Sequence, residues 1–282
     1  MKIFLSLLLS FFLLPLAANP SPSPSINYEV KFLLQPAKIL QADNSVKPEV
    51  LAQLKLTDAK TEQFRVGYID SDARSLGAAG WSMRLRKRAD QQAHRLQYKK
   101  RYPLQANEQH EVLDAAISQA RADGFDIADP AFKVEIDWGL HRQTLSFAYT
   151  TTPNFALADA LAMPSPESVL PLLPELAPKA MPPQLLTKAP LQIYGYVPFD
   201  RYSKKSVKLA KQQFNELTLE VWHYPASEQQ AGFNLVELSF AATGSAQASA
   251  LRQSMLQQLT EWGWLAEQQQ LKTQLTITHF SL

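Results

Sequence analysis

Basic residues recur at every second position in two neighbouring segments, a spacing that could hold a chain of phosphates. The segment WSMRLRKR places Arg84, Arg86 and Arg88 on one face of an expected strand. After a short turn, HRLQYKKR repeats the pattern with Arg95 and Lys99. Guanidinium and ammonium groups donate charge-assisted hydrogen bonds to phosphate oxygens. The solvated face of a half-buried hairpin would show the same alternation, so the hairpin alone leaves both interpretations open.

Carboxylates on other expected strands favour the phosphate interpretation. INYEVKFLL alternates strictly and puts Glu29 and Lys31 on its charged face, and two late strands carry Glu220 and Glu237. Carboxylate oxygens beside phosphate-binding bases are what Mg²⁺ or Mn²⁺ needs in order to assist phosphoryl transfer. A late basic run adds Lys204 as a further base for phosphate.

Alternating strands of this kind could position these groups by closing into a barrel with a polar interior. The sequence predicts an α+β protein in which helices pack outside the strands. The expected strands cover 26–34, 64–70, 81–88, 94–101, 132–138, 144–149, 193–198, 203–210, 217–223, 235–240 and 272–280, and the expected helices cover 47–56, 107–122 and 246–262.

Composition bounds the class of protein. Hydrophobic residues make up 46% of the 282 residues, which excludes a disordered chain, and a net charge of +2 argues against a general nucleic-acid binder. The absence of Cys excludes thiolate nucleophiles, disulfides and Cys-ligated metals. The five His show no metal-ligand spacing, and no nucleophile-elbow or Walker motif occurs. The five Trp are expected to pack the outer apolar faces of the strands.

The N-terminal segment is expected to be a targeting signal and not part of the fold. Residues 1–18 have one positive charge, a short apolar stretch and small residues at the end, as in a secretory signal peptide, with an uncleaved anchor as the alternative. A Pro/Ser spacer follows at 19–25, then a single domain at 26–282 with a Pro-rich insertion at about 151–190. Export implies a periplasmic or secreted protein, and no later segment could span a membrane.

Several stretches resemble the CYTH domain of the triphosphate tunnel metalloenzymes, the superfamily of class IV adenylate cyclases, thiamine triphosphatases and inorganic triphosphatases. YEVKF is similar to the family's opening E-x-E-x-K strand, and YIDSDARSLGAAGWSMRLRKR resembles its tyrosine-aspartate turn, glycine and L-R-x-R strand. HRLQYKK falls where the family has a strand ending in a phosphate-binding lysine. RYSKKSVKL, LTLEVW and LVELSF look like its late basic and acidic strands.

The resemblance implies an eight-stranded antiparallel tunnel in which bases grip a linear triphosphate and carboxylates hold a divalent metal. Glu29 and Lys31 would be the catalytic pair. Carried over onto this chain, the phosphate-binding residues would be Lys31, Arg84, Arg86 and Lys99, with Arg95 and Lys204 as further bases, and the metal ligands would be Glu29, Glu220 and Glu237.

Two positions depart from the family's pattern. Asn27 stands where the first glutamate of the opening strand should be, and Ser239 where the second glutamate of the closing strand should be. Glu135 and Asp137 are possible substitutes, although the exposed face of a hairpin is the simpler interpretation of this pair. The sequence therefore predicts a weakened metal site.

The predicted function is binding of inorganic tripolyphosphate or a related polyphosphate, with hydrolysis assisted by Mg²⁺ or Mn²⁺. Cyclase activity is disfavoured because an exported protein does not meet cytosolic ATP. The alternative is a non-catalytic periplasmic protein that binds polyphosphate or another polyanion. A structural protein whose charged strands face solvent is the third interpretation.

Overall fold

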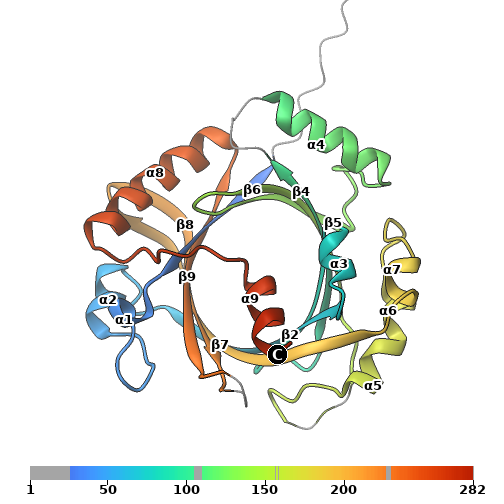
Figure 1. The fold of residues 1–282 in the computed structure, drawn as a ribbon. Helices are drawn as coiled ribbons and strands as arrows, with labels where there is room; N and C mark the ends of the chain where they lie inside the picture. The colour runs from blue at the N-terminus through green and yellow to red at the C-terminus, as the bar shows by residue number, and fades with distance from the viewer. Residues whose placement is uncertain (1–25, 105–109, 156, 158, 227–229, 282) are drawn as a thin grey trace, which may run out of the picture.

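The computed structural model describes residues 26–104, 110–155, 157, 159–226 and 230–281, and in this part of the chain nine strands close into a barrel (Figure 1). Their order around the barrel is β1-β5-β6-β4-β3-β2-β7-β8-β9. The strands are β1 (Asn27–Leu34), β2 (Lys60–Ser71), β3 (Trp81–Arg88), β4 (Arg95–Leu104), β5 (Phe132–Trp138), β6 (Gln143–Thr151), β7 (Leu191–Leu209), β8 (Gln212–Tyr224) and β9 (Phe233–Thr243).

The barrel corrects the expectation of eight antiparallel strands. It has nine among the described residues, and β1 runs parallel to β5, with Asn27 beside Glu135 and Glu29 beside Asp137. The other neighbouring strands pair antiparallel. The hairpin of β5 and β6 is inserted between β1 and β4, so a hairpin that the sequence could not place becomes part of the wall. The two strands expected at 193–198 and 203–210 are one continuous strand, β7.

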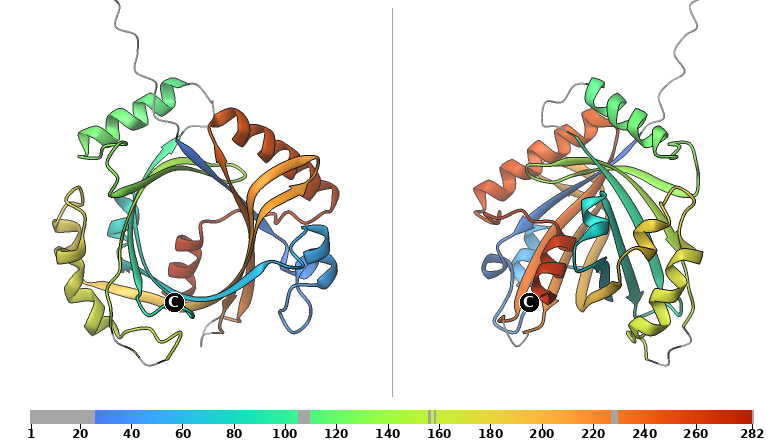
Figure 2. Two further views of the ribbon diagram at one scale, coloured as in Figure 1. Left: turned by 180° about the vertical axis from the view of Figure 1, so that it is seen from behind. Right: turned by 45° about the vertical axis from the view of Figure 1, so that its right-hand side comes forward.

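Alternation along β3 separates outward apolar side chains from inward polar ones. In β3 the outward side chains Trp81, Met83 and Leu85 are buried, whereas the intervening arginines point inward. Helices cover the outside of the wall (Figure 2). They are α1 (Pro36–Ile39), α2 (Pro48–Gln53), α3 (Ser75–Ala78), α4 (His110–Ala122) and α8 (Ser245–Glu261). The first residues of the helix expected at 107–122 lie outside the described residues.

The Pro-rich segment between β6 and β7 contains short helices that pack on the outer face. These are α5 (Pro166–Val169), a 3₁₀ turn (Leu170–Leu172), α6 (Leu173–Leu176) and α7 (Gln184–Thr187). Val169 and Leu173 are buried against the wall, and the Tyr98 hydroxyl donates a hydrogen bond of 2.8 Å to the Leu173 carbonyl. No helix in the described part of the chain is long and apolar enough to cross a membrane.

The last element, α9 (Lys272–Phe280), is a helix and not the strand that the sequence suggested. It lies within the ring of strands, at the mouth where β2 ends and β7 begins (Figure 1). Its Ile277 side chain is buried in an apolar core inside the barrel. Trp222 belongs to this inner core, stacked on Phe199 at 4.3 Å between ring centroids, which corrects the expectation that every Trp packs outside. The barrel interior is thus apolar at the α9 end.

Candidate functional site

The rest of the barrel interior is a charged cavity of about 770 Å³. Most of the residues singled out from the sequence line it: Glu29, Lys31, Arg84, Arg86, Arg95, Lys99, Glu220 and Glu237. Lys204 does not line the cavity. Its neighbour Ser203 faces inward, so Lys204 points to the other side of β7 and pairs with Asp58, and its assignment as a phosphate-binding base is corrected.

Three arginines on the wall of the cavity have no carboxylate within ion-pair distance among the described residues: Arg84, Arg86 and Arg95. Arg86 and Arg95 face each other across the β3–β4 pair, and the Arg86 guanidinium lies 5.4 Å from the centre of the Phe64 ring. Burial and the neighbouring cations Arg84 and Arg201 lower the pKa of Arg86 to about 9. The side chain is still charged at neutral pH, so this wall carries positive charge that is not neutralised locally.

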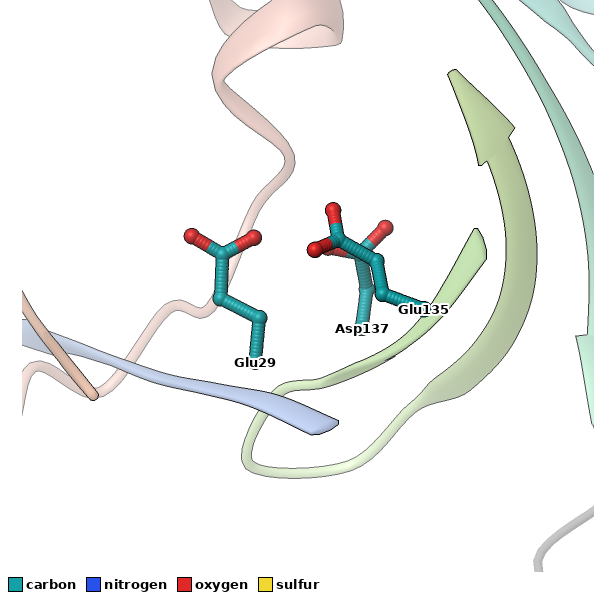
Figure 3. A group of neighbouring side chains, drawn as sticks. All are labelled: Glu29, Glu135 and Asp137. Atoms are coloured by element: carbon teal, nitrogen blue, oxygen red, sulfur yellow. The ribbon is translucent and has the colours of Figure 1, made fainter. Parts of the chain in front are cut away.

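Three carboxylates meet on the opposite strands of the barrel. Oxygen atoms of Glu29, Glu135 and Asp137 all lie within 4.8 Å of one another. Figure 3 shows the three carboxyl groups side by side, Glu29 on β1 and the other two on β5. The parallel pairing of β1 and β5 creates this group, since it sets Glu29 beside Asp137 and Asn27 beside Glu135. The interpretation of Glu135 and Asp137 as an exposed hairpin face is therefore wrong.

Three lysines contact this carboxylate group, and one of them is Lys133, whose Nζ lies 2.5 Å from Glu135 Oε2. Lys31 Nζ lies 2.8 Å from Glu29 and 2.7 Å from Asp137, and Lys99 Nζ lies 2.6 Å from Asp137 and 3.0 Å from Glu135. Burial alone would raise the pKa of Glu29, but Lys31 and Lys99 outweigh it and lower the pKa to about 2. The carboxylate is therefore ionised at any physiological pH. With 32% of the Glu29 side chain exposed, it is open to a cation from the cavity.

The other two expected metal ligands form a separate group. Glu220 and Glu237 pair across β8 and β9, and Lys272 of α9 bridges them at 2.7 and 2.8 Å. Glu237 is paired with Leu33 of β1. Leu33 lies four residues from Glu29, so the backbone positions of Glu29 and Leu33 are about 13 Å apart along the strand. One ion contacting all three glutamates does not fit this arrangement. The expected set of Glu29, Glu220 and Glu237 is corrected to two separate acidic groups.

Five cations that line the cavity were not assigned to the site from the sequence: Arg101, Lys133, Arg142, Arg201 and Lys272. Arg101 follows Lys99 at strand spacing and Lys133 precedes Glu135 at the same spacing, so the period-two pattern could have identified both. Arg201 contacts Glu220 at 2.6 Å. Lys272 could not be identified in this way, because its position depends on α9, and the segment was expected to be a strand.

A hard divalent cation fits the group of Glu29, Glu135 and Asp137, because carboxylate oxygens are its preferred ligands and these lie close enough to share one ion. Lys31 and Lys99 contact the same three carboxylates. Both lysines also line the cavity, where a bound phosphate would offer them another partner. The arrangement can therefore hold a cation and an anion next to each other.

Comparison with known proteins supports the family suggested by the motifs. Residues 25–146 match the family model of the CYTH domain, which confirms the resemblance for that part of the chain. No curated protein sequence matches.

Three solved structures align with most of this chain at low sequence identity. Protein bh2851 of Bacillus halodurans is 14% identical, with a TM-score of 0.45, over 89% of this chain and 97% of that one. HpAC1 of Hippeastrum, described as having a dominant triphosphatase activity, is 11% identical with a TM-score of 0.45, over 90% and 96% of the two chains. PH1819 of Pyrococcus horikoshii is 11% identical with a TM-score of 0.41, over 89% and 97%.

Proposed function

We propose that this chain, whose residues 25–146 match the CYTH domain, binds inorganic tripolyphosphate or a related linear polyphosphate in its barrel and hydrolyses it with Mg²⁺ or Mn²⁺. The observation that carries the proposal is the set of inward arginines without carboxylate partners, Arg84, Arg86 and Arg95, opposite the carboxylate group of β1 and β5. A linear polyphosphate with a divalent cation is complementary to both walls.

Each group has a distinct role in the proposed reaction. Arg84 and Arg86 would neutralise and orient the phosphate chain, and Arg95 would extend this contact along β4. Lys31 and Lys99 would turn from the carboxylates towards phosphate oxygens, which leaves Glu29 and Asp137 free to hold the cation. A divalent cation at this position supplies Lewis-acid polarisation of a phosphoryl group and orients water.

Glu135 is our candidate to compensate for Asn27. Glu135 stands beside Asn27 on the neighbouring parallel strand, and its carboxyl group lies within reach of Glu29. We infer that Glu135 provides the carboxylate that the opening strand lacks. The site would then hold three anionic ligands although β1 contributes only one.

The second candidate function is binding without turnover. It is favoured by one specific observation: Lys31, Lys99 and Lys133 already form ion pairs with the three carboxylates that a metal would need. If these ion pairs persist when an anion binds, the barrel is a polyphosphate-binding protein without a metal centre. Metal-dependent release of phosphate separates the two functions.

The expected processing and location belong to this proposal. We propose a signal peptide at 1–18, a spacer at 19–25, and a mature periplasmic or secreted protein in which 26–282 form a single domain with an insertion at about 151–190. Mass spectrometry of protein recovered from the periplasm tests the first point. A mass that corresponds to removal of 18 residues supports it, and a full-length mass in the membrane fraction contradicts it.

The test of function is phosphate release from tripolyphosphate by protein that starts at Asn19, with Mg²⁺ and with Mn²⁺. We expect metal-dependent release that is lost in Glu29→Ala and in Arg86→Ala, and kept in Lys204→Ala, whose base lies outside the cavity. Absence of release by folded protein with either metal would rule out hydrolysis of this substrate. A rise in melting temperature with tripolyphosphate would then support the binding function.

A further inference from the structure

A lysine from the last helix lies between two buried carboxylates of the barrel wall. Lys272 Nζ is 2.7 Å from Glu220 Oε2 and 2.8 Å from Glu237 Oε1, and it lies 4.5 Å from the centre of the Trp222 ring. The exposed fraction is 15% for the Lys272 side chain and 7% for each glutamate. Such a pair of carboxylates across two strands needs a cation between them, and here the chain itself provides one.

The approach to α9 fixes the position of this lysine. Just before the helix, the Gln269 side chain accepts a hydrogen bond from the Leu33 backbone N–H and donates one to the Leu33 carbonyl, both of 3.0 Å. Inside the barrel, Ile277 is buried and the Thr276 hydroxyl is 2.8 Å from that of Tyr224. The helix is therefore held on both sides of Lys272, and the ammonium group is presented to the glutamates by packed structure.

The placement of Lys272 has a local electrostatic cost. It is the first residue of α9, and no acidic residue lies in the first turn. A positive charge at a helix N-terminus is unfavourable, because the backbone N–H groups there already carry positive partial charge. The contacts with Glu220 and Glu237 offset this cost, which indicates that the lysine serves the barrel wall and not the helix.

Charge is balanced within this group. Glu220 contacts Arg201 as well as Lys272, so two carboxylates face two cations. A divalent metal would have to displace an ammonium that is held by α9, at carboxylates with almost no exposure. The group of Glu29, Glu135 and Asp137 differs, since Glu29 and Lys31 are 32% and 27% exposed on the cavity side.

We propose that Lys272 is an internal counter-ion that keeps the Glu220–Glu237 pair closed to divalent cations while α9 is seated in the barrel. This inference goes beyond the proposed function, because it concerns the cation content of the resting protein whether or not phosphate is released. Metal then binds only at the β1–β5 side of the cavity. Removing the ammonium converts Glu220 and Glu237 into a second cation site.

The test counts bound Mn²⁺ by electron paramagnetic resonance of the free ion, and follows melting temperature with and without Mn²⁺. We expect Lys272→Met to bind one more Mn²⁺ per chain than the wild type, and to melt lower without metal and recover with Mn²⁺. Lys272→Arg, which keeps the charge, should bind the wild-type number. Lys272→Met combined with Glu237→Gln should lose the additional ion.

A milder variant keeps the test decisive if Lys272→Met does not fold. In Glu237→Gln the lysine retains Glu220, and the Mn²⁺ count should equal that of the wild type. A lower count in Glu237→Gln would overturn the proposal, since the glutamate would then be a metal ligand in the native protein. Folded Lys272→Met that gains no Mn²⁺ would overturn it as well. Neither result depends on phosphate release, so failure of the proposed hydrolysis remains a separate outcome.

Discussion

Gly195 of β7 lies directly against the ring of Phe280 at the end of α9. A Cβ atom added to Gly195 would lie 2.2 Å from Cε2 of Phe280, and the residue has a φ of +62°. Only glycine meets both conditions without strain, because it has no Cβ and adopts positive φ freely. The close contact of β7 with α9 at this point allows α9 to pack inside the barrel.

We expect Gly195→Ala to destabilise the protein by more than about 1–2 kcal/mol, because it adds a steric clash to the cost of positive φ. Urea unfolding measures the change. Gly263→Ala is the matched control, since Gly263 has a φ of +65° with nothing within 4 Å of its added Cβ. Equal losses in the two variants would show that Phe280 does not press on this strand.

Arg86→Ala should weaken binding of tripolyphosphate by about tenfold to a hundredfold, the loss expected for charge-assisted hydrogen bonds. Isothermal titration calorimetry measures the affinity. Lys204→Ala removes the same charge from the outer side of β7 and should leave the affinity within about twofold. Similar losses in both variants would point to a general effect of net charge and against a site on β3.

Asp137→Asn should lower the affinity for Mn²⁺ by at least about tenfold, since it removes one of three anionic ligands from the group on β1 and β5. Binding is measured by calorimetry at constant ionic strength. Glu216→Gln is the control, because Glu216 lines the same cavity without belonging to that group. An unchanged affinity in Asp137→Asn would place the cation elsewhere.

His223 should make stability depend on pH near neutrality. Its Nε2 lies 3.1 Å from Asp200 Oδ2 and its Nδ1 2.9 Å from Asn234 Oδ1, and the hydrogen bond to Asp200 raises the pKa of His223 above 6.5. A raised pKa gives stability that is complete below about 6.5 and is lost as the pH rises through the folded-state value.

The wild type should therefore lose more free energy of unfolding between pH 6 and pH 9 than His223→Gln does. Urea unfolding at both pH values gives the comparison, and the other titrating groups cancel in the difference. Identical losses in the two proteins would mean that the Asp200 contact does not favour the protonated imidazole.

Strand periodicity was sufficient to predict most of the cavity wall. The alternation in β3 and β4 placed Arg84, Arg86 and Lys99 on one face, and these residues do line the interior. The same alternation could not assign the partner of each strand. Pairing of β1 with β5 depends on closure of the whole barrel, so the contact of Glu29 with Asp137 had no local signal.

The helix α9 shows where local pattern and tertiary structure disagree. Leu275 and Ile277 alternate, and the β-branched residues around them favour a strand. Within the barrel, the segment instead packs as a helix on the inner apolar core, with Ile277 buried. Packing of one helix face outweighs weak intrinsic propensity over nine residues, and the position of Lys272 could not be predicted without it.

The order of strands has a consequence for how the chain folds during synthesis. The first six strands, β1 to β6, form one continuous sheet whose two edges are β1 and β2. The open side of β1 is paired only by β9 and that of β2 only by β7, and both of these strands are synthesised later. Until β7, β8 and β9 emerge, these edges present unpaired backbone groups that can join another chain. The first half of the polypeptide is therefore vulnerable to aggregation until the C-terminal meander closes it, and a fragment that ends after β6 should be insoluble alone.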